Sequence, residues 1–189
     1  LPLHLVNKAD VDTWRSGLSD NERAWLETCG FSGAFGQVCV MPGDGGLPEW
    51  AVGGLGSEMS QKRGRFAVSK IRQALPKGVW RIVTDHKPDI LNETALGWLL
   101  AGYVFDRYNE KSAPKAALVA PKGIDASQLE RVAQSEALTR DLINTPAADM
   151  GPSHLAQAAE SLAAEFGAAF RMIEGAALET DFPMIHAVG

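Results

Sequence analysis

A turn bounded by prolines, between two segments with helical patterning, places the strongest constraint on how this chain can fold. Proline disfavours the α conformation in the residue before it, so Pro146 predicts that the first helix ends at Asn144. Pro152 stands where proline suits the first turn of the next helix. The first helix, from about Asp125, is long for a connection, and we interpret it as a spacer between two domains.

Before that spacer, strand patterns alternate with helix patterns. Ser19 and Glu22 have the spacing of a capping box and predict a helix that begins there. The turn residues 42–46 separate two apolar segments, which predicts a β-hairpin. Residues 116–120 are nearly all apolar, as in a strand covered on both faces. The expected strands are residues 3–6, 37–41, 49–52, 79–83 and 116–120, and the expected helices are residues 19–26, 67–75 and 89–103. This order predicts an α/β domain with a mixed sheet.

The segment after the turn predicts the beginning of a second α/β domain. Apolar residues recur at helical spacing over residues 155–166, and Gly167 is placed to end that helix. Residues 170–174 and 182–188 read as two strands, which with the helix would make a first βα unit. A strand at the end of a chain needs neighbours for its backbone groups, so we expect this chain to be a fragment.

Composition and charge exclude several classes of function. The net charge is −5, from 18 Lys and Arg against 23 Asp and Glu, which predicts no nucleic-acid partner. The apolar runs are far shorter than the roughly 20 residues of a membrane span, and the opening segment does not resemble an export signal. Cys29 and Cys39 lack the pattern of a zinc site or a disulfide framework, a usage typical of a reducing cytoplasm. Cys39 lies in an apolar run and is expected in the core.

The sequence offers no catalytic, cofactor-binding or metal-binding residue. No histidine has the spacing of a metal-binding motif on a helix; the four are His4, His86, His154 and His186. Asp85 beside His86 is the nearest pair to a catalytic dyad, and we interpret it as a solvated loop pair. The tryptophans are expected in the core or at subunit contacts; they are Trp14, Trp25, Trp50, Trp80 and Trp98.

Glycine-rich and charged segments could suggest ligand binding, and each has a plainer interpretation. Residues 53–57 lack the lysine of a P-loop and the full spacing of a dinucleotide motif, so glycines that let the backbone turn after a strand are favoured. The basic residues 62–65, with Lys70 and Arg72 beyond, favour a solvated helix face over phosphate binding. Residues 140–141, Arg-Asp, are interpreted as an ion pair or cap that fixes the angle between domains.

The proline-bounded turn also carries a resemblance to a known family. Residues 140–152 closely resemble the junction before the catalytic domain of leucyl (cytosol) aminopeptidases. Their sequence is Arg-Asp-Leu-Ile-Asn-Thr-Pro-Ala-Ala-Asp-Met-Gly-Pro. Residues 31–37, 52–56 and 101–108 are similar to the amino-terminal domain of a bacterial branch of that family. Residues 184–189 resemble the strand that opens its catalytic domain. The resemblance therefore covers nearly the whole chain.

This resemblance implies a domain organisation and an activity. It implies an amino-terminal α/β domain at residues 1–122, a spacer helix at 123–147 and the incomplete start of a catalytic peptidase domain at 148–189. The resemblance implies a homohexameric, cytoplasmic aminopeptidase. Such an enzyme uses two divalent metal ions, Mn or Zn, to remove N-terminal residues from peptides. Its metal ligands, lysines and catalytic arginine would fall after residue 189, so this segment would serve assembly and active-site access and would be inactive alone.

Two other functions stay open at this point. One is a non-catalytic α/β module that binds a nucleotide-like or phosphate ligand through its glycine-rich loops. The other is a structural or interaction protein that has lost its catalytic half.

Overall fold

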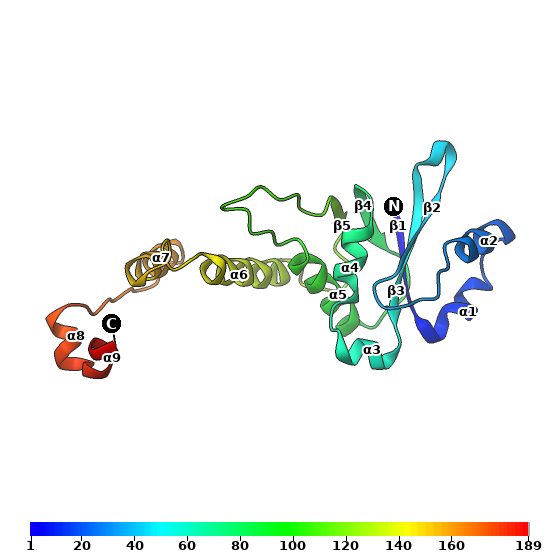
Figure 1. The fold of residues 1–189 in the computed structure, drawn as a ribbon. Helices are drawn as coiled ribbons and strands as arrows, with labels where there is room; N and C mark the ends of the chain where they lie inside the picture. Colours follow the sequence, from blue (N-terminus) through cyan, green and yellow to red (C-terminus); the bar gives the residue numbers. More distant parts are fainter. Residues whose placement is uncertain (189) are drawn as a thin grey trace. The chain divides into compact units, whose positions relative to one another are not determined.

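The computed structural model describes residues 1–188 and divides the chain into two compact units, Leu1–Thr139 and Arg140–Gly189 (Figure 1).

The first unit is built on a five-stranded mixed sheet. Its strands are β1 (Pro2–Asn7), β2 (Val38–Pro42), β3 (Pro48–Gly56), β4 (Gly78–Ile82) and β5 (Ala116–Leu118). They lie in the order β2-β3-β1-β4-β5. The β2–β3 pair is antiparallel, and the other pairs are parallel. The predicted hairpin and mixed sheet are therefore confirmed.

Helices lie on both faces of this sheet, with α1 and α2 on one side and α4 and α5 on the other (Figure 1). Ser19 caps α2 as predicted, because its backbone N–H donates to the Glu22 carboxylate at 2.8 Å and its hydroxyl accepts from the Glu22 N–H at 3.4 Å. The helices are α1 (Val11–Arg15), α2 (Asp20–Thr28), α3 (Glu58–Arg63), α4 (Ala67–Ala74) and α5 (Pro88–Leu100), with 3-10 turns at Lys8–Asp10 and Asp44–Gly46.

Two hydrophobic cores follow from the alternation of side chains along the strands. On β1, Leu3 and Leu5 belong to the core under α4 and α5, whereas Val6 belongs to the core under α1 and α2. Trp80 of β4 is fully buried in the first core. Cys39 lies in the second core, as predicted, and burial together with the nearby Cys29 thiol raises its pKa to about 12. Cys39 is therefore an uncharged core residue at neutral pH.

The prediction that β5 is covered on both faces is wrong. Ala116 is buried, but Ala117 is exposed, and Val79 on the neighbouring strand is 59% exposed. The physical reason is the extent of the second core, whose buried residues come only from β1, β2, β3, α1, α2 and the loop after α2 among the described residues. One face of the β4–β5 edge is consequently left open, although its sequence is as apolar as that of a covered strand.

The long helix α6 (Ala126–Asn144) starts in the first unit, where Asp125 accepts a hydrogen bond from the Gln128 N–H at 3.0 Å. Its predicted end at Asn144 is confirmed. Beyond the turn lies α7 (Pro152–Glu165), which ends before Gly167 with its positive φ of 64°. The chain then forms two short helices, α8 (Ala176–Asp181) and α9 (Pro183–Val188).

The two strands predicted after α7 are wrong. Residues 170–174 are irregular, and residues 183–188 form α9. A strand needs a neighbour for its backbone groups, and the described part of this unit contains no strand. A helical turn satisfies them locally, as where the Ile185 N–H donates to the Phe182 carbonyl at 3.0 Å. Gly189, the last residue of the segment that resembles the opening strand of the family's catalytic domain, lies outside the described residues.

The half-buried imidazole of His4 makes the stability of the first unit depend on pH. It contacts the rings of Trp14 and Trp50, and its Nδ1 accepts a hydrogen bond from the Trp14 indole at 3.3 Å. Burial lowers the pKa of His4, and the negative charge of Glu22 offsets only part of this decrease. The unfolded chain therefore binds a proton more readily, so this contribution to stability is present above about pH 6.5 and decreases as the pH falls below it.

We expect the urea midpoint of the chain to be lower at pH 5.5 than at pH 7.5. The decrease should be smaller in His4→Asn, because asparagine keeps a hydrogen-bond acceptor but does not titrate. Urea titrations of both proteins at the two pH values measure this difference. Equal decreases in both would show that His4 is not the titrating group.

Candidate functional site

No described group of side chains has the composition of a metal centre. Among residues 1–188, no three or more His, Cys, Asp or Glu side chains lie close enough to hold a metal ion. The histidines serve local structure in at least three places: His4 lies among aromatic rings, His86 contacts the end of β1, and His154 accepts from the Gly151 N–H at 3.1 Å at the start of α7. No described helix is both long and apolar enough to cross a lipid bilayer.

The Asp85–His86 pair is not the solvated pair that the sequence suggests, because His86 is half-buried against β1. Its Nε2 lies 3.2 Å from the Leu5 carbonyl oxygen and 3.1 Å from the Thr84 hydroxyl. The carbonyl can only accept, which assigns the hydrogen to Nε2. That nitrogen is therefore engaged in the fold and is not available to a metal ion.

Thr84 and His86 together complete the hydrogen bonding of β1 beyond the end of β4. The ladder between these strands pairs only Pro2 with Arg81 and Leu3 with Ile82. Two residues further on, the Leu5 N–H donates to the Thr84 hydroxyl at 3.0 Å. The two side chains thus replace a missing stretch of strand.

Replacing Thr84 with valine should lower the free energy of unfolding by about 1–3 kcal/mol, because it leaves the N–H of the buried residue Leu5 without an acceptor. Urea unfolding measures the change. The matched control is Thr139→Val, at an exposed helix position where the hydroxyl bonds only within its own helix. A Thr84 variant as stable as the Thr139 variant would contradict this role.

The glycines of residues 53–57 are required by close packing inside the domain. Strand β3 continues to Gly56, so the expectation that the backbone turns away after residue 52 is wrong. A Cβ at Gly54 would lie 2.3 Å from the Ala34 carbonyl oxygen, and one at Gly56 would lie 2.8 Å from the Phe35 Cβ. The loop before β2 therefore occupies the space that a phosphate would need, which removes the structural basis for a glycine-rich ligand loop.

The basic cluster is solvated only in part. Lys62 pairs with Glu58 at 2.7 Å, and Arg65 pairs with Glu93 at 2.8 Å, both on exposed surface. Arg72 instead is half-buried, so the expectation of a solvated face is wrong there. Its Nη1 donates to the Trp98 carbonyl, its Nε donates to the Ala116 carbonyl at 3.3 Å, and burial lowers its pKa.

The turn between α6 and α7 is organised around Thr145, which is buried although it is polar. Its hydroxyl donates to the Asp141 carbonyl at 2.6 Å, and its N–H donates to the same oxygen at 3.1 Å. These bonds close the last turn of α6 just before the proline. The role predicted for residues 140–141 as an ion pair or cap stays a prediction.

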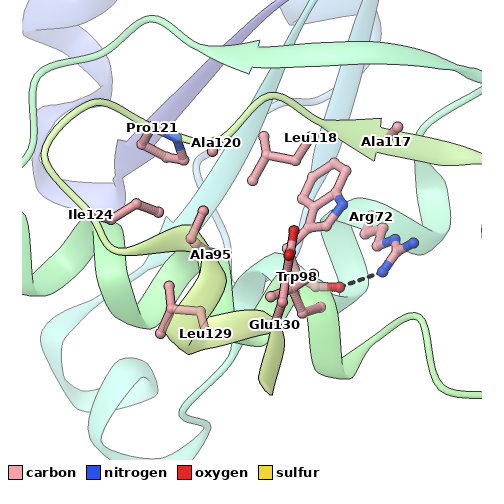
Figure 2. A pocket seen from close by; sticks show the side chains of 12 residues that line it. Arg72, Ala95, Trp98, Ala117, Leu118, Ala120, Pro121, Ile124, Leu129 and Glu130 are labelled. Atoms are coloured by element: carbon pink, nitrogen blue, oxygen red, sulfur yellow. Dashed lines mark hydrogen bonds between the residues drawn. The ribbon is translucent and has the colours of Figure 1, made fainter. Parts of the chain in front are cut away.

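A cavity of about 250 Å³ lies inside the first unit, between α5, β5 and the start of α6 (Figure 2). Its walls are mostly aliphatic, with contributions from Ala95, Leu99, Leu118, Ile124 and Leu129. Three side chains with polar atoms also line it, namely Arg72, Trp98 and Glu130. They come from α4, α5 and α6, and no pattern of neighbouring residues in the sequence singles them out.

Comparison with known proteins gives the family of this chain. Residues 1–121 match the family described as M17 aminopeptidase, N-terminal domain. The probable cytosol aminopeptidase of Leifsonia xyli subsp. xyli is 31% identical over 168 residues, which covers 79% of this chain and 33% of that protein. That of Streptomyces avermitilis is 32% identical over 203 residues, which covers 92% of this chain and 40% of that protein. The chain thus spans about a third to two-fifths of the length of these relatives.

Solved structures agree with the sequence comparison. The crystal structure of the cytosol aminopeptidase from Coxiella burnetii matches with a TM-score of 0.87 and 31% identity, and covers 100% of this chain and 41% of that one. The bottromycin maturation enzyme BotP, in complex with Mn, shares the fold, with a TM-score of 0.72 at 22% identity over 95% of this chain and 39% of that one. The fold, the family match over residues 1–121 and these relatives agree: the chain belongs to the M17 aminopeptidase family, through its N-terminal domain.

Proposed function

We propose that this chain is the amino-terminal part of a two-metal aminopeptidase that removes N-terminal residues from peptides. The observation that carries the proposal is the match to the Coxiella burnetii cytosol aminopeptidase, which extends over 100% of this chain but only 41% of that protein. A family member of that length has room for a catalytic domain after the segment that matches this chain. On this proposal, residues 1–122 form the amino-terminal domain, 123–147 the spacer helix, and 148–189 the start of the catalytic domain.

The metal ions are proposed to bind beyond residue 189. A pair of divalent ions, Mn or Zn, needs several carboxylate or imidazole ligands close together. The described residues 1–188 provide no such group, so they do not fit a metal pair. When bound, the metal pair supplies Lewis acidity and an activated water for peptide hydrolysis. The role proposed for this chain is to support assembly into a homohexamer in the cytoplasm and to limit access to the active site.

Activity of a protein extended past Gly189 tests the chemical part of the proposal. We expect it to hydrolyse leucine p-nitroanilide with Mn²⁺ or Zn²⁺, to lose activity in EDTA, and to regain it when metal is returned. The 189-residue chain under the same conditions is the control, and we expect no turnover from it. An extended protein that is folded and metal-loaded but inactive on a panel of amino-acid anilides would overturn the assignment.

Light scattering coupled to size exclusion tests the assembly part separately. The extended protein should elute with about six times the mass of one protomer. A monomer at micromolar concentration would contradict the proposed hexamer and leave the peptidase assignment standing.

A further inference from the structure

The cavity between α5, β5 and α6 combines apolar walls with one cation and one anion that lack partners of opposite charge. Arg72 has no carboxylate within 4.0 Å among residues 1–188. Only its Nε and Nη1 have hydrogen-bond acceptors in the described chain, which leaves Nη2 without one. Glu130 likewise forms no ion pair within the part of the chain that the structure describes.

Trp98 lies between these two charges in the view of Figure 2 and adds a second donor without an acceptor. Its side chain is buried, and its indole Nε1 has no hydrogen-bond partner among the described residues. The guanidinium carbon of Arg72 lies 5.6 Å from the centre of its ring. A buried donor without a partner is uncommon in folded proteins, and Trp98 is one of the residues that line this cavity.

The aliphatic walls define the rest of the ligand. The volume of about 250 Å³ corresponds to about eight water molecules, which is the scale of a small organic molecule. Aliphatic side chains such as Leu99, Ile124 and Leu129 favour a branched apolar group there. A ligand that satisfies all three features carries a negative group, a positive group and an apolar side chain.

We propose that this cavity binds a free apolar α-amino acid such as leucine, with its carboxylate at Arg72, its ammonium at Glu130 and its side chain among the aliphatic residues. The binding chemistry depends on the cavity alone. The biological role of the site rests on the proposed function, because an apolar amino acid is a product that such an aminopeptidase releases. A site in this domain would let the protein sense that product.

Calorimetric titration of the 189-residue chain with L-leucine tests the proposal. We expect saturable binding with a Kd on the order of 1 mM. Leucinamide, N-acetylleucine and glycine each lack one of the three recognised groups, and each should bind at least about tenfold more weakly. No saturable binding of leucine, or equal binding of N-acetylleucine, would overturn the proposal.

Two variants locate the site. Glu130→Gln removes the ammonium partner from an exposed position and should weaken leucine binding by about tenfold, while the matched control Glu160→Gln, on an exposed face of α7, should leave it unchanged. Ala120→Phe, at an exposed residue of the cavity wall, should abolish binding by filling the space. Binding that is unchanged in Glu130→Gln and in Ala120→Phe, each checked for an unaltered melting temperature, would place the ligand elsewhere. Because this titration needs no catalysis, its failure is distinguishable from failure of the peptidase assay.

Discussion

Replacing Trp80 with alanine is expected to lower the free energy of unfolding of this chain by about 3–5 kcal/mol. The side chain is fully buried on β4, in the core that also contains Leu3 and Ile71. Its indole N–H donates to the Pro76 carbonyl at 3.3 Å, so the change also removes a hydrogen bond. Small domains have a total stability of about 5–15 kcal/mol, and this loss would therefore remove a large fraction of it. Urea unfolding followed by circular dichroism measures it.

Trp25→Ala is the matched control, because Trp25 is 40% exposed and makes one hydrogen bond, to the Val40 carbonyl at 3.0 Å. It should cost less than Trp80→Ala, roughly 2 kcal/mol, from the loss of that bond and of a partly buried ring. Similar losses in the two variants would show that the core is not centred on Trp80.

Replacing Gly54 with alanine should also be severely destabilising, by about 3 kcal/mol or more. The added methyl group would lie 2.3 Å from the Ala34 carbonyl oxygen and 2.6 Å from the Gly33 carbonyl carbon. Both are backbone atoms, so no change of side-chain rotamer relieves the clash. The Gly54 N–H also donates to the Gln37 carbonyl at 2.8 Å, which holds the same loop against β3. We expect the loop and the strand to separate in the variant.

The comparison for this variant is Gly17→Ala, where the nearest atom to an added Cβ is the Trp14 carbonyl oxygen at 3.6 Å and the backbone is not left-handed. That variant should unfold within about 0.5 kcal/mol of the parent chain. A Gly54 variant that retains the parent urea midpoint would mean that the loop is not packed on β3 as described.

The elements that the sequence predicts well are those fixed by neighbouring residues. Three such elements depend on contacts within a few residues, and all three are confirmed. They are the capping box of Ser19 and Glu22, the hairpin around residues 42–46 and the end of α6 before Pro146. The α/β class follows from their order along the chain, and it is confirmed as well.

The elements that the sequence predicts badly depend on distant partners. Residues 183–188 have a strand-like composition, but without a neighbouring strand in the described chain they form α9. The open face of β5 depends on how far α1 and α2 extend over the sheet, and the β5 sequence carries no signal for that. The glycines at 53 and 54 look like a turn or a ligand loop, yet they allow α4 and the loop before β2 to approach the strand.

The same distinction applies to the candidate sites. The family resemblance rests on continuous segments, the most specific being residues 140–152, and could be recognised from sequence. His86 could not be assigned to β1, because its partner Leu5 lies 81 residues earlier. The cavity could not be predicted from the sequence, because Arg72, Trp98 and Glu130 lie on three different helices and line one cavity only in the folded chain.

We propose that the metal-dependent chemistry of the full-length protein belongs to residues after Gly189. Metal content measured by plasma mass spectrometry, after dialysis with Mn²⁺ or Zn²⁺, tests that claim directly in the 189-residue chain and in the extended protein. We expect about two equivalents of metal per protomer in the extended protein and none in the 189-residue chain. Stoichiometric metal retained by the 189-residue chain, or none retained by the extended protein, would contradict it.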